Sequence, residues 1–190
     1  MTQLSSINFL HKLRSYKLWL VLFTLCLLIQ TFDLQSVLRF DRQLIVQGQI
    51  WRLISAHLTH LNWPHFMLNM AGLSLIAIFF SHYKSTKYWL GALFFIALFC
   101  SAGLLLDNQL NKYVGFSGVL HGLFIVGGRW ELRRYTLSGV VLLTLIIGKI
   151  VWEQMFGALP GSESMVNGRV AINAHLYGGI AGVVYLFRRG

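Results

Sequence analysis

Long apolar blocks separated by short polar segments dominate the hydrophobic pattern of this chain. Six blocks approach the roughly 20 residues that a helix needs to cross the hydrocarbon core of a bilayer. These blocks cover residues 16–35, 64–83, 87–106, 114–131, 136–156 and 172–187. No run of alternating apolar and polar residues indicates a strand, and a helix satisfies its own backbone hydrogen bonds in lipid. The pattern predicts an all-α, polytopic membrane protein with six transmembrane helices, in a single domain over residues 1–190.

The composition supports a membrane protein. Hydrophobic residues make up 56% of the 190 residues and charged residues 12%, about half the charged fraction of a soluble domain.

The first block follows several basic residues, as in a signal peptide, but it is long and lacks a small-residue cleavage site. We therefore expect a retained anchor. Cys26 and Cys100 both fall within the blocks, without CxxC spacing, and are interpreted as buried packing residues.

The basic residues are unevenly distributed between the two sides of the predicted bundle. An even number of spans places both termini on one side. That side collects ten of the sixteen basic residues: Lys12, Arg14, Lys17, Lys84, Lys87, Arg129, Arg133, Arg134, Arg188 and Arg189. Because cytoplasmic segments are enriched in Lys and Arg, both termini are predicted to be cytoplasmic. The spread of these residues over short turns argues against nucleic acid as a partner, despite a net charge of +10.

Polar residues mark the start of the second span, in the stretch "NWPHFMLN". Asn62 and Pro64 are suited to the first positions of a helix, where asparagine caps the backbone and proline is tolerated. His65 and Asn69 lie four residues apart, so both project from one face of that helix. This face lies at the outer, non-cytoplasmic end of the bundle.

The fourth and sixth spans also carry polar residues at their outer ends. Ser117 lies within "YVGFSGVLHG", and His175 opens the sixth span in "NAHLYGGIAG". Each span has a small-xxx-small face, formed by Gly118 and Gly122 in one and by Gly178 and Gly182 in the other. Such faces let two helices approach closely. Pairing them would bring His175 towards Ser117, and costly intramembrane polar groups usually face a cavity or each other.

These residue types fit acyl transfer. A serine hydroxyl becomes a nucleophile when a neighbouring base removes its proton, and a neutral imidazole suits that task. The reaction also needs donors where the oxyanion forms, and His65, Asn69 and the backbone amide of Ser117 are candidates. No carboxylate that could be the third member of a triad stands at a recognisable position at this level. We therefore expect a Ser–His dyad and no triad.

The chain resembles the rhomboid family of intramembrane serine proteases over about residues 40–187. The resemblance rests on four motifs in order: "WR" at Trp51 and Arg52, H-x3-N at His65 and Asn69, G-x-S-G from Gly115 to Gly118, and "AH" at Ala174 and His175 with Gly178 and Gly182 after it. The stretches "GFSGVLHG" and "KIVWEQ" are similar to the rhombosortase subgroup. We expect Trp51 and Arg52 to anchor the first outer loop at the lipid interface.

The resemblance implies a rhomboid-like bundle with Ser117 as nucleophile and His175 as general base. It implies that His65 and Asn69 support the oxyanion, and that no cofactor is needed. Its substrates would be single-pass exported proteins with a C-terminal GlyGly motif, a hydrophobic helix and a basic tail. The protein would lie in a bacterial inner membrane, in contact with lipid, with its active site open to the periplasm.

Three features leave alternatives open. His121, one turn after the serine, either competes with His175 as the base or orients it by stacking. Lys149 and Glu153, four apart in the fifth span, either form a local ion pair that neutralises two costly charges or line a substrate gate. The glycine-containing segment 157–171 is a candidate lid over the site.

Two other functions compete with proteolysis. An inactive rhomboid-like protein would bind membrane helices without cleaving them. A haem or metal protein would use some of the histidines at positions 57, 65, 121 and 175, and His57, His60 and His65 have H-x2-H-x4-H spacing. The chain has no H-E-x-x-H motif and few acidic residues, so we expect no metal site.

Overall fold

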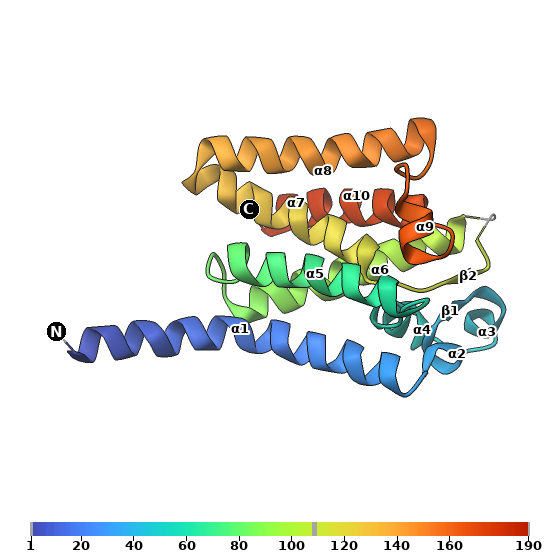
Figure 1. Ribbon diagram of the computed structural model, residues 1–190, viewed down its shortest axis with the longest axis horizontal. Coiled ribbons are helices and arrows are strands. Elements are labelled where there is room, and N and C mark those ends of the chain that lie inside the picture. Colours follow the sequence, from blue (N-terminus) through green and yellow to red (C-terminus); the bar gives the residue numbers. More distant parts are fainter. Residues whose placement is uncertain (1, 108–109, 190) are drawn as a thin grey trace.

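Six long helices form the body of the protein. The computed structural model describes residues 2–107 and 110–189, and the helices are α1 (Thr2–Thr31), α5 (Trp63–Phe80), α6 (Thr86–Leu106), α7 (Ser117–Arg134), α8 (Thr136–Phe156) and α10 (Ile172–Arg189). They lie side by side and alternate in direction, so that α1 begins and α10 ends at the same end of the bundle (Figure 1). The predicted helical architecture is confirmed for the body of the protein, and each of these helices overlaps one predicted span; the described residues also include one short strand pair outside the bundle.

Three of the helices are long and apolar enough to cross a membrane on length and composition, among the described residues. These are α5, α6 and α8, while the apolar part of α1 is the shorter segment Ser15–Thr31. Helices α7 and α10 have 18 residues each and contain charged residues at their ends. A helical membrane protein is therefore confirmed, and the count of six spans stays a prediction.

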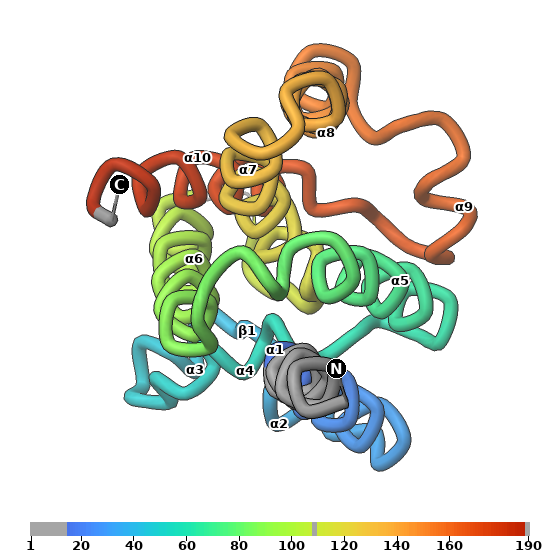
Figure 2. The backbone as a smooth tube through the Cα atoms, turned by 90° about the vertical axis from the view of Figure 1, so that its left-hand side faces the viewer, coloured from blue at the N-terminus to red at the C-terminus, as the bar shows by residue number. Residues whose placement is uncertain are grey.

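Helix α7 lies in the middle of the bundle. It packs against α10, α8, α5 and α6 (Figure 2). Most of its residues from Gly118 to Gly128 are buried. A helix enclosed by other helices does not meet lipid along its length, so it can carry more small and polar residues than a lipid-facing one.

The contact between α7 and α10 is made through the predicted glycine faces. A Cβ atom at Gly118 would lie 2.8 Å from the Ala174 carbonyl oxygen, and one at Gly122 would meet the Gly178 carbonyl oxygen at 2.5 Å. In the other direction, a Cβ atom at Gly182 would lie 2.5 Å from the Gly122 carbonyl oxygen. The two backbones are thus too close for any side chain, which confirms the predicted small-xxx-small packing.

The segment between α1 and α5 folds into short elements at the opposite end of the bundle from the start of α1 (Figure 1). They are α2 (Gln35–Leu38), β1 (Phe40–Asp41), α3 (Arg42–Val46), α4 (Arg52–Ser55) and the 3₁₀ turn η1 (Ala56–Leu58). Strand β1 pairs antiparallel with β2 (Lys112–Tyr113), with Phe40 opposite Tyr113. This pairing ties the loop to the segment that leads into α7.

Two arginines hold this loop together from inside. Arg52 is buried, and its Nη1 donates to the Arg39 carbonyl oxygen at 2.7 Å. Arg42 donates to carbonyl oxygens at the end of α6, including that of Leu104 at 2.8 Å. Carbonyls at a helix end lack intrahelical partners, so a guanidinium satisfies them. The expectation that Arg52 lies at the lipid interface is therefore wrong, because its charge is used inside the loop, while Trp51 is exposed.

His57 attaches the same loop to α6. It is buried, and its Nε2 lies 3.1 Å from the Ala97 carbonyl oxygen and 3.0 Å from the Ser101 Oγ. The Ser101 hydroxyl donates to the Leu53 carbonyl oxygen at 2.5 Å, so Nε2 of His57 is the donor. Burial lowers the pKa of His57 to about 4, and that of His60 to about 3, so both are neutral in the folded loop.

We predict that Gly178→Ala strongly destabilises the bundle. The added methyl would be placed against the carbonyl oxygen of Gly118, so α7 and α10 would have to separate. Overpacking of this kind costs about 1–3 kcal/mol or more. Gly148→Ala is the matched control, because a Cβ atom there meets nothing within 4 Å and alanine is the better helix former by up to ~1 kcal/mol. Thermal unfolding in detergent should show a lower midpoint for the first variant alone; equal midpoints would contradict the packing argument.

We also predict that the loop loses stability in acid. The unfolded chain binds a proton at His57 near pH 6.5 and the folded chain only near pH 4, so stability falls as pH falls between these values. The loss from this residue between pH 7 and pH 5 should be about 2 kcal/mol. In His57→Gln the thermal midpoint should fall less between pH 7 and pH 5 than in wild type. Replacing the exposed His82 by Gln is the control, and its midpoint should fall by as much as in wild type. An unchanged pH dependence in His57→Gln would contradict this assignment.

Candidate active site

The backbone before α7 places Ser117 at the first position of the helix. Gly115 has φ of +128°, which favours glycine. Its N–H donates to the Ala56 carbonyl oxygen at 3.1 Å, and its carbonyl oxygen accepts from the Tyr113 hydroxyl at 2.6 Å. Burial raises the pKa of Tyr113 well above its usual value, so this phenol stays a donor. The first N–H groups of a helix lack intrahelical partners and carry partial positive charge, and those of α7 begin at Ser117.

Ser117 and His175 are joined by a hydrogen bond across the α7–α10 contact. The Ser117 Oγ lies 2.9 Å from the His175 Nε2. His175 is buried, and its other ring nitrogen lies 2.8 Å from the Glu153 Oε2. Since a carboxylate accepts, Nδ1 of His175 carries the proton, and Nε2 is free to accept from the serine. The structure thus brings the predicted serine and imidazole together with the geometry that proton transfer needs.

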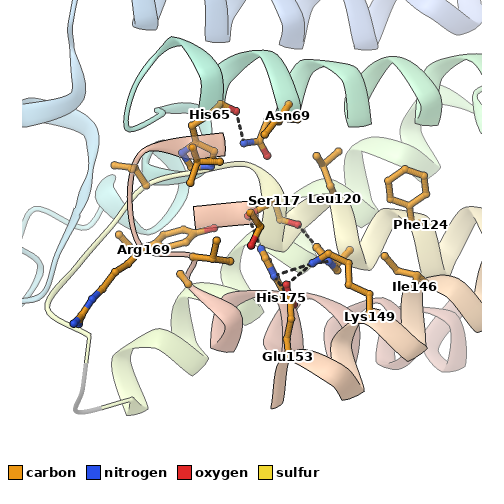
Figure 3. Close-up of a pocket in the computed structure, with 18 residues that line it drawn as sticks. His65, Asn69, Ser117, Leu120, Phe124, Ile146, Lys149, Glu153, Arg169 and His175 are labelled. Carbon is orange, nitrogen blue, oxygen red and sulfur yellow. Dashed lines mark hydrogen bonds and ion pairs between the residues drawn. The ribbon is translucent and has the colours of Figure 1, made fainter. Parts of the chain in front are cut away.

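The expectation that no carboxylate reaches this level is wrong. Glu153, on α8, is 1% exposed and points at His175 (Figure 3). From the sequence, this residue is expected either to pair with Lys149 or to line a substrate gate with it. The ion pair is confirmed at 2.5 Å between Nζ and Oε1. The Glu153 carboxylate therefore contacts a lysine with one oxygen and the imidazole with the other. Lys149 and Glu153 also line the cavity beside Ser117, and a gate stays a prediction.

His121 stacks on His175 and does not contact the serine hydroxyl. The two ring centroids lie 4.1 Å apart with 15° between the planes. The His121 Nδ1 donates to the Ser117 carbonyl oxygen at 2.7 Å, and its Nε2 accepts from the Lys149 Nζ at 3.1 Å. Both ring nitrogens of His121 thus have other hydrogen-bond partners. His175, and not His121, is hydrogen-bonded to the Ser117 Oγ.

A lysine ammonium lies where a metal ion would have to bind. Within the described residues, one group of three potential ligands gathers its atoms within 4.8 Å: His121, Glu153 and His175. The Lys149 Nζ lies within 3.4 Å of an atom of each. The spacing of His57, His60 and His65 does not produce such a group, because His57 bonds α6 and His60 packs its ring edge-on against His65 at 5.4 Å. Nothing in this donor set favours a metal over the ammonium.

His65 and Asn69 face Ser117 from α5. The Asn62 side chain caps this helix by accepting from the His65 N–H at 2.9 Å, as predicted. The His65 Nδ1 accepts from the Leu61 N–H at 3.3 Å, so its Nε2 carries the proton. A Cβ atom at Gly115 would lie 3.0 Å from this Nε2 and 3.9 Å from the Ser117 Oγ. The missing side chain of Gly115 thus leaves a small space between a donor and the serine hydroxyl.

A cavity of about 310 Å³ opens beside the serine. It is lined by α5, α7, α8, α10 and the segment before α10, and its deeper wall is apolar, with Leu120, Phe124 and Ile146 (Figure 3). Asn69 lines it and donates to the His65 carbonyl oxygen at 2.9 Å. The cavity therefore offers polar groups around Ser117 and an apolar surface beyond them.

The candidate lid covers one side of this cavity. The segment 157–171 contains α9 (Ser162–Val166), and Gly157 and Gly161 have positive φ. The Asn62 Nδ2 donates to the Val166 carbonyl oxygen at 2.5 Å, which fastens α9 to the start of α5. Val166 and Arg169 line the cavity. The position fits a lid, and its movement stays a prediction.

Comparison with known families concerns the part of the chain that builds this site. A family model described as Rhomboid domain matches residues 47–190, which is more than half of the chain. This range includes every residue that lines the cavity, from His65 to His175. A comparison with curated proteins gives no match.

Proposed function

The chain belongs to the rhomboid family of intramembrane serine proteases, and on that premise we propose that it is an active endopeptidase with Ser117 as nucleophile and His175 as base. The observation that carries the proposal is the 2.9 Å contact between Ser117 Oγ and His175 Nε2 beside a cavity large enough for a peptide segment. Nucleophile and base come from different helices. The glycine contact sets how near they come, but it does not require the two side chains to turn towards each other.

The chemistry follows from this contact. Ser117 Oγ attacks the carbonyl carbon of the scissile bond while His175 Nε2 takes the hydroxyl proton. The C–N bond then breaks as the imidazolium gives that proton to the leaving amine. Water, activated in the same way by His175, attacks the acyl-serine ester, releases a carboxylic acid and restores the serine. His65 Nε2 and the backbone N–H groups at the start of α7 would stabilise the oxyanion, with Asn69 as a further donor.

The substrate would be the end of a membrane helix that enters between α5 and α8. Both helices line the cavity, while α7 and α10 close it from behind. A peptide bond inside a helix is shielded, so the segment must be extended before it is cut, and glycine lowers the cost of unwinding. We infer that the cut segment is the C-terminal GlyGly–helix–basic-tail signal of exported proteins, supported by the similarity of "GFSGVLHG" and "KIVWEQ" to rhombosortases.

This function goes with a defined location. The protein would lie in a bacterial inner membrane, with both termini cytoplasmic and the cavity open to the periplasm, where exported substrates emerge. The excess of basic residues on the side of the termini supports this orientation. The elements around Ser117 lie at the other end of the bundle (Figure 1).

Co-expression with a membrane protein carrying a GlyGly–helix–basic-tail segment tests the proposal. Wild type should shorten the substrate, as seen by mass spectrometry of its new C-terminus, and Ser117→Ala should leave it intact because the nucleophile is lost. Ser162→Ala, which alters another serine lining the cavity, is the matched control and should cut normally. Processing by Ser117→Ala would overturn the assignment. Binding without any wild-type cleavage would instead indicate an inactive binder of membrane helices.

A second experiment identifies the base. Fluorophosphonate should label Ser117 in wild type, and His175→Ala should reduce the labelling rate by at least about 10³, because His175 Nε2 is the base hydrogen-bonded to Ser117 Oγ. His121→Phe should keep most of the rate, since a flat ring at this position can still stack on His175. Loss of labelling in His121→Phe, with labelling kept in His175→Ala, would assign the base to His121. A visible absorption band or stoichiometric metal in the purified protein would favour the haem or metal alternative.

A further inference from the structure

We propose that Glu153 is a positioning residue for His175, so that the protein uses a Ser117–His175–Glu153 triad in which Lys149 holds the carboxylate. This inference rests on the proposed function and extends it. A serine protease needs only the first two groups to break the bond. The third would act through the imidazole, without touching the substrate.

The contacts of Glu153 use both of its oxygens. Oε2 lies 2.8 Å from the His175 Nδ1, and Oε1 lies 2.5 Å from the Lys149 Nζ. The lysine and glutamate are four apart on one helix, and such a pair can form on any helix face. A local ion pair does not require the second contact of Glu153. That contact is with His175 on another helix, and His175 is itself hydrogen-bonded to the nucleophile Ser117.

The burial of Glu153 has a free-energy cost that packing alone does not explain. The described part of α8 has three buried residues, Gly139, Ile150 and Glu153, and the rest of the helix is exposed or half-buried. A carboxylate is expensive inside a membrane, and an apolar pair would pack at lower cost. Glu153 is nevertheless the buried polar residue through which α8 contacts α10.

The carboxylate would perform two tasks for His175. It keeps the proton of the neutral ring on Nδ1, which leaves Nε2 able to accept from Ser117. It also faces the ring nitrogen at which positive charge appears when the imidazolium forms. With Lys149 and Glu153 both ionised and both imidazoles neutral, the cluster has no net charge, and the imidazolium and the oxyanion arise together, so net charge stays zero in the transition state.

Lys149 would set the orientation of the whole group. Its ammonium donates to the Glu153 Oε1 and to the His121 Nε2, at 2.5 and 3.1 Å. The first contact turns the remaining oxygen towards His175. The second places the proton of His121 on Nδ1, where it bonds the Ser117 carbonyl oxygen. Since Lys149 and Glu153 are on α8, the triad is complete only while α8 is docked against α7 and α10.

The test uses full-length protein in detergent with the substrate of the co-expression experiment. Glu153→Gln keeps the size but can donate to Nδ1 and stabilise the wrong tautomer, so kcat should fall by about 10²–10⁴. KM and the thermal midpoint should stay close to wild type. Glu153→Asp keeps the charge on a shorter stem and should have an intermediate kcat. Lys149→Met should reduce kcat as well, by less than Glu153→Gln.

Glu131→Gln is the matched control. Glu131 also uses both oxygens, accepting from the hydroxyls of Tyr83 and Ser138 at 2.6 Å, but it lies at the other end of α7. Its replacement should leave kcat unchanged. A double mutant separates a positioning role from a structural one: in the His175→Ala background, Glu153→Gln should lower the residual rate no further, whereas a purely structural role would lower it in both backgrounds.

Three results would overturn the triad. They are a kcat within threefold of wild type in folded Glu153→Gln, equal losses with and without His175, and, if Glu153→Gln does not fold, a wild-type kcat in Glu153→Asp. These outcomes differ from failure of the protease proposal itself. An inactive Ser117→Ala together with a fully active Glu153→Gln would leave the protease in place and remove only the third member.

Discussion

The close approach of α7 and α10 is the interaction on which the rest of this protein depends. Gly118 and Gly122 meet Gly178 and Gly182 so closely that no Cβ atom fits between the backbones. Lipid tails do not drive helices together, so packing of this kind is what holds membrane helices in register. Because Ser117 and His175 stand one position and three positions before the first of these contacts, the glycines set the distance between hydroxyl and imidazole.

The polar cluster is tolerated inside an apolar bundle because its members satisfy one another. Lys149, Glu153, His121 and His175 form a connected network of hydrogen bonds between three helices. Each charge has an opposite charge beside it, and each imidazole has partners that define its tautomer. A partly satisfied network at this depth would be more costly than an apolar core. The same interactions that make the cluster tolerable also orient the groups that react.

The central position of α7 explains a feature of the hydrophobic pattern. Helices α5, α6 and α8 are apolar enough to cross a membrane by composition, whereas α7 is not among them. Other helices cover α7, so it needs small residues for packing and can carry the serine and histidine of the site. Helix α8 differs from α7 in burial: it is apolar and largely exposed on the surface of the bundle, and its Glu153 is buried.

The sequence by itself determined the helical membrane architecture, the glycine faces, the cap at Asn62 and the pairing of Ser117 with His175. The first three follow from periodicity and from short-range geometry, because residues four apart share a helix face wherever the helix lies. The Ser117–His175 pairing follows from matching the glycine faces of two helices. The sequence also indicated the Lys149–Glu153 pair and the stacking of His121. Only the tertiary structure decided that Glu153 reaches His175, that Arg52 turns into the loop and that an ammonium occupies the space among the candidate metal ligands. These contacts depend on how each helix is rotated about its axis and which neighbour it meets. Packing of the whole bundle sets that rotation, and no local pattern encodes it.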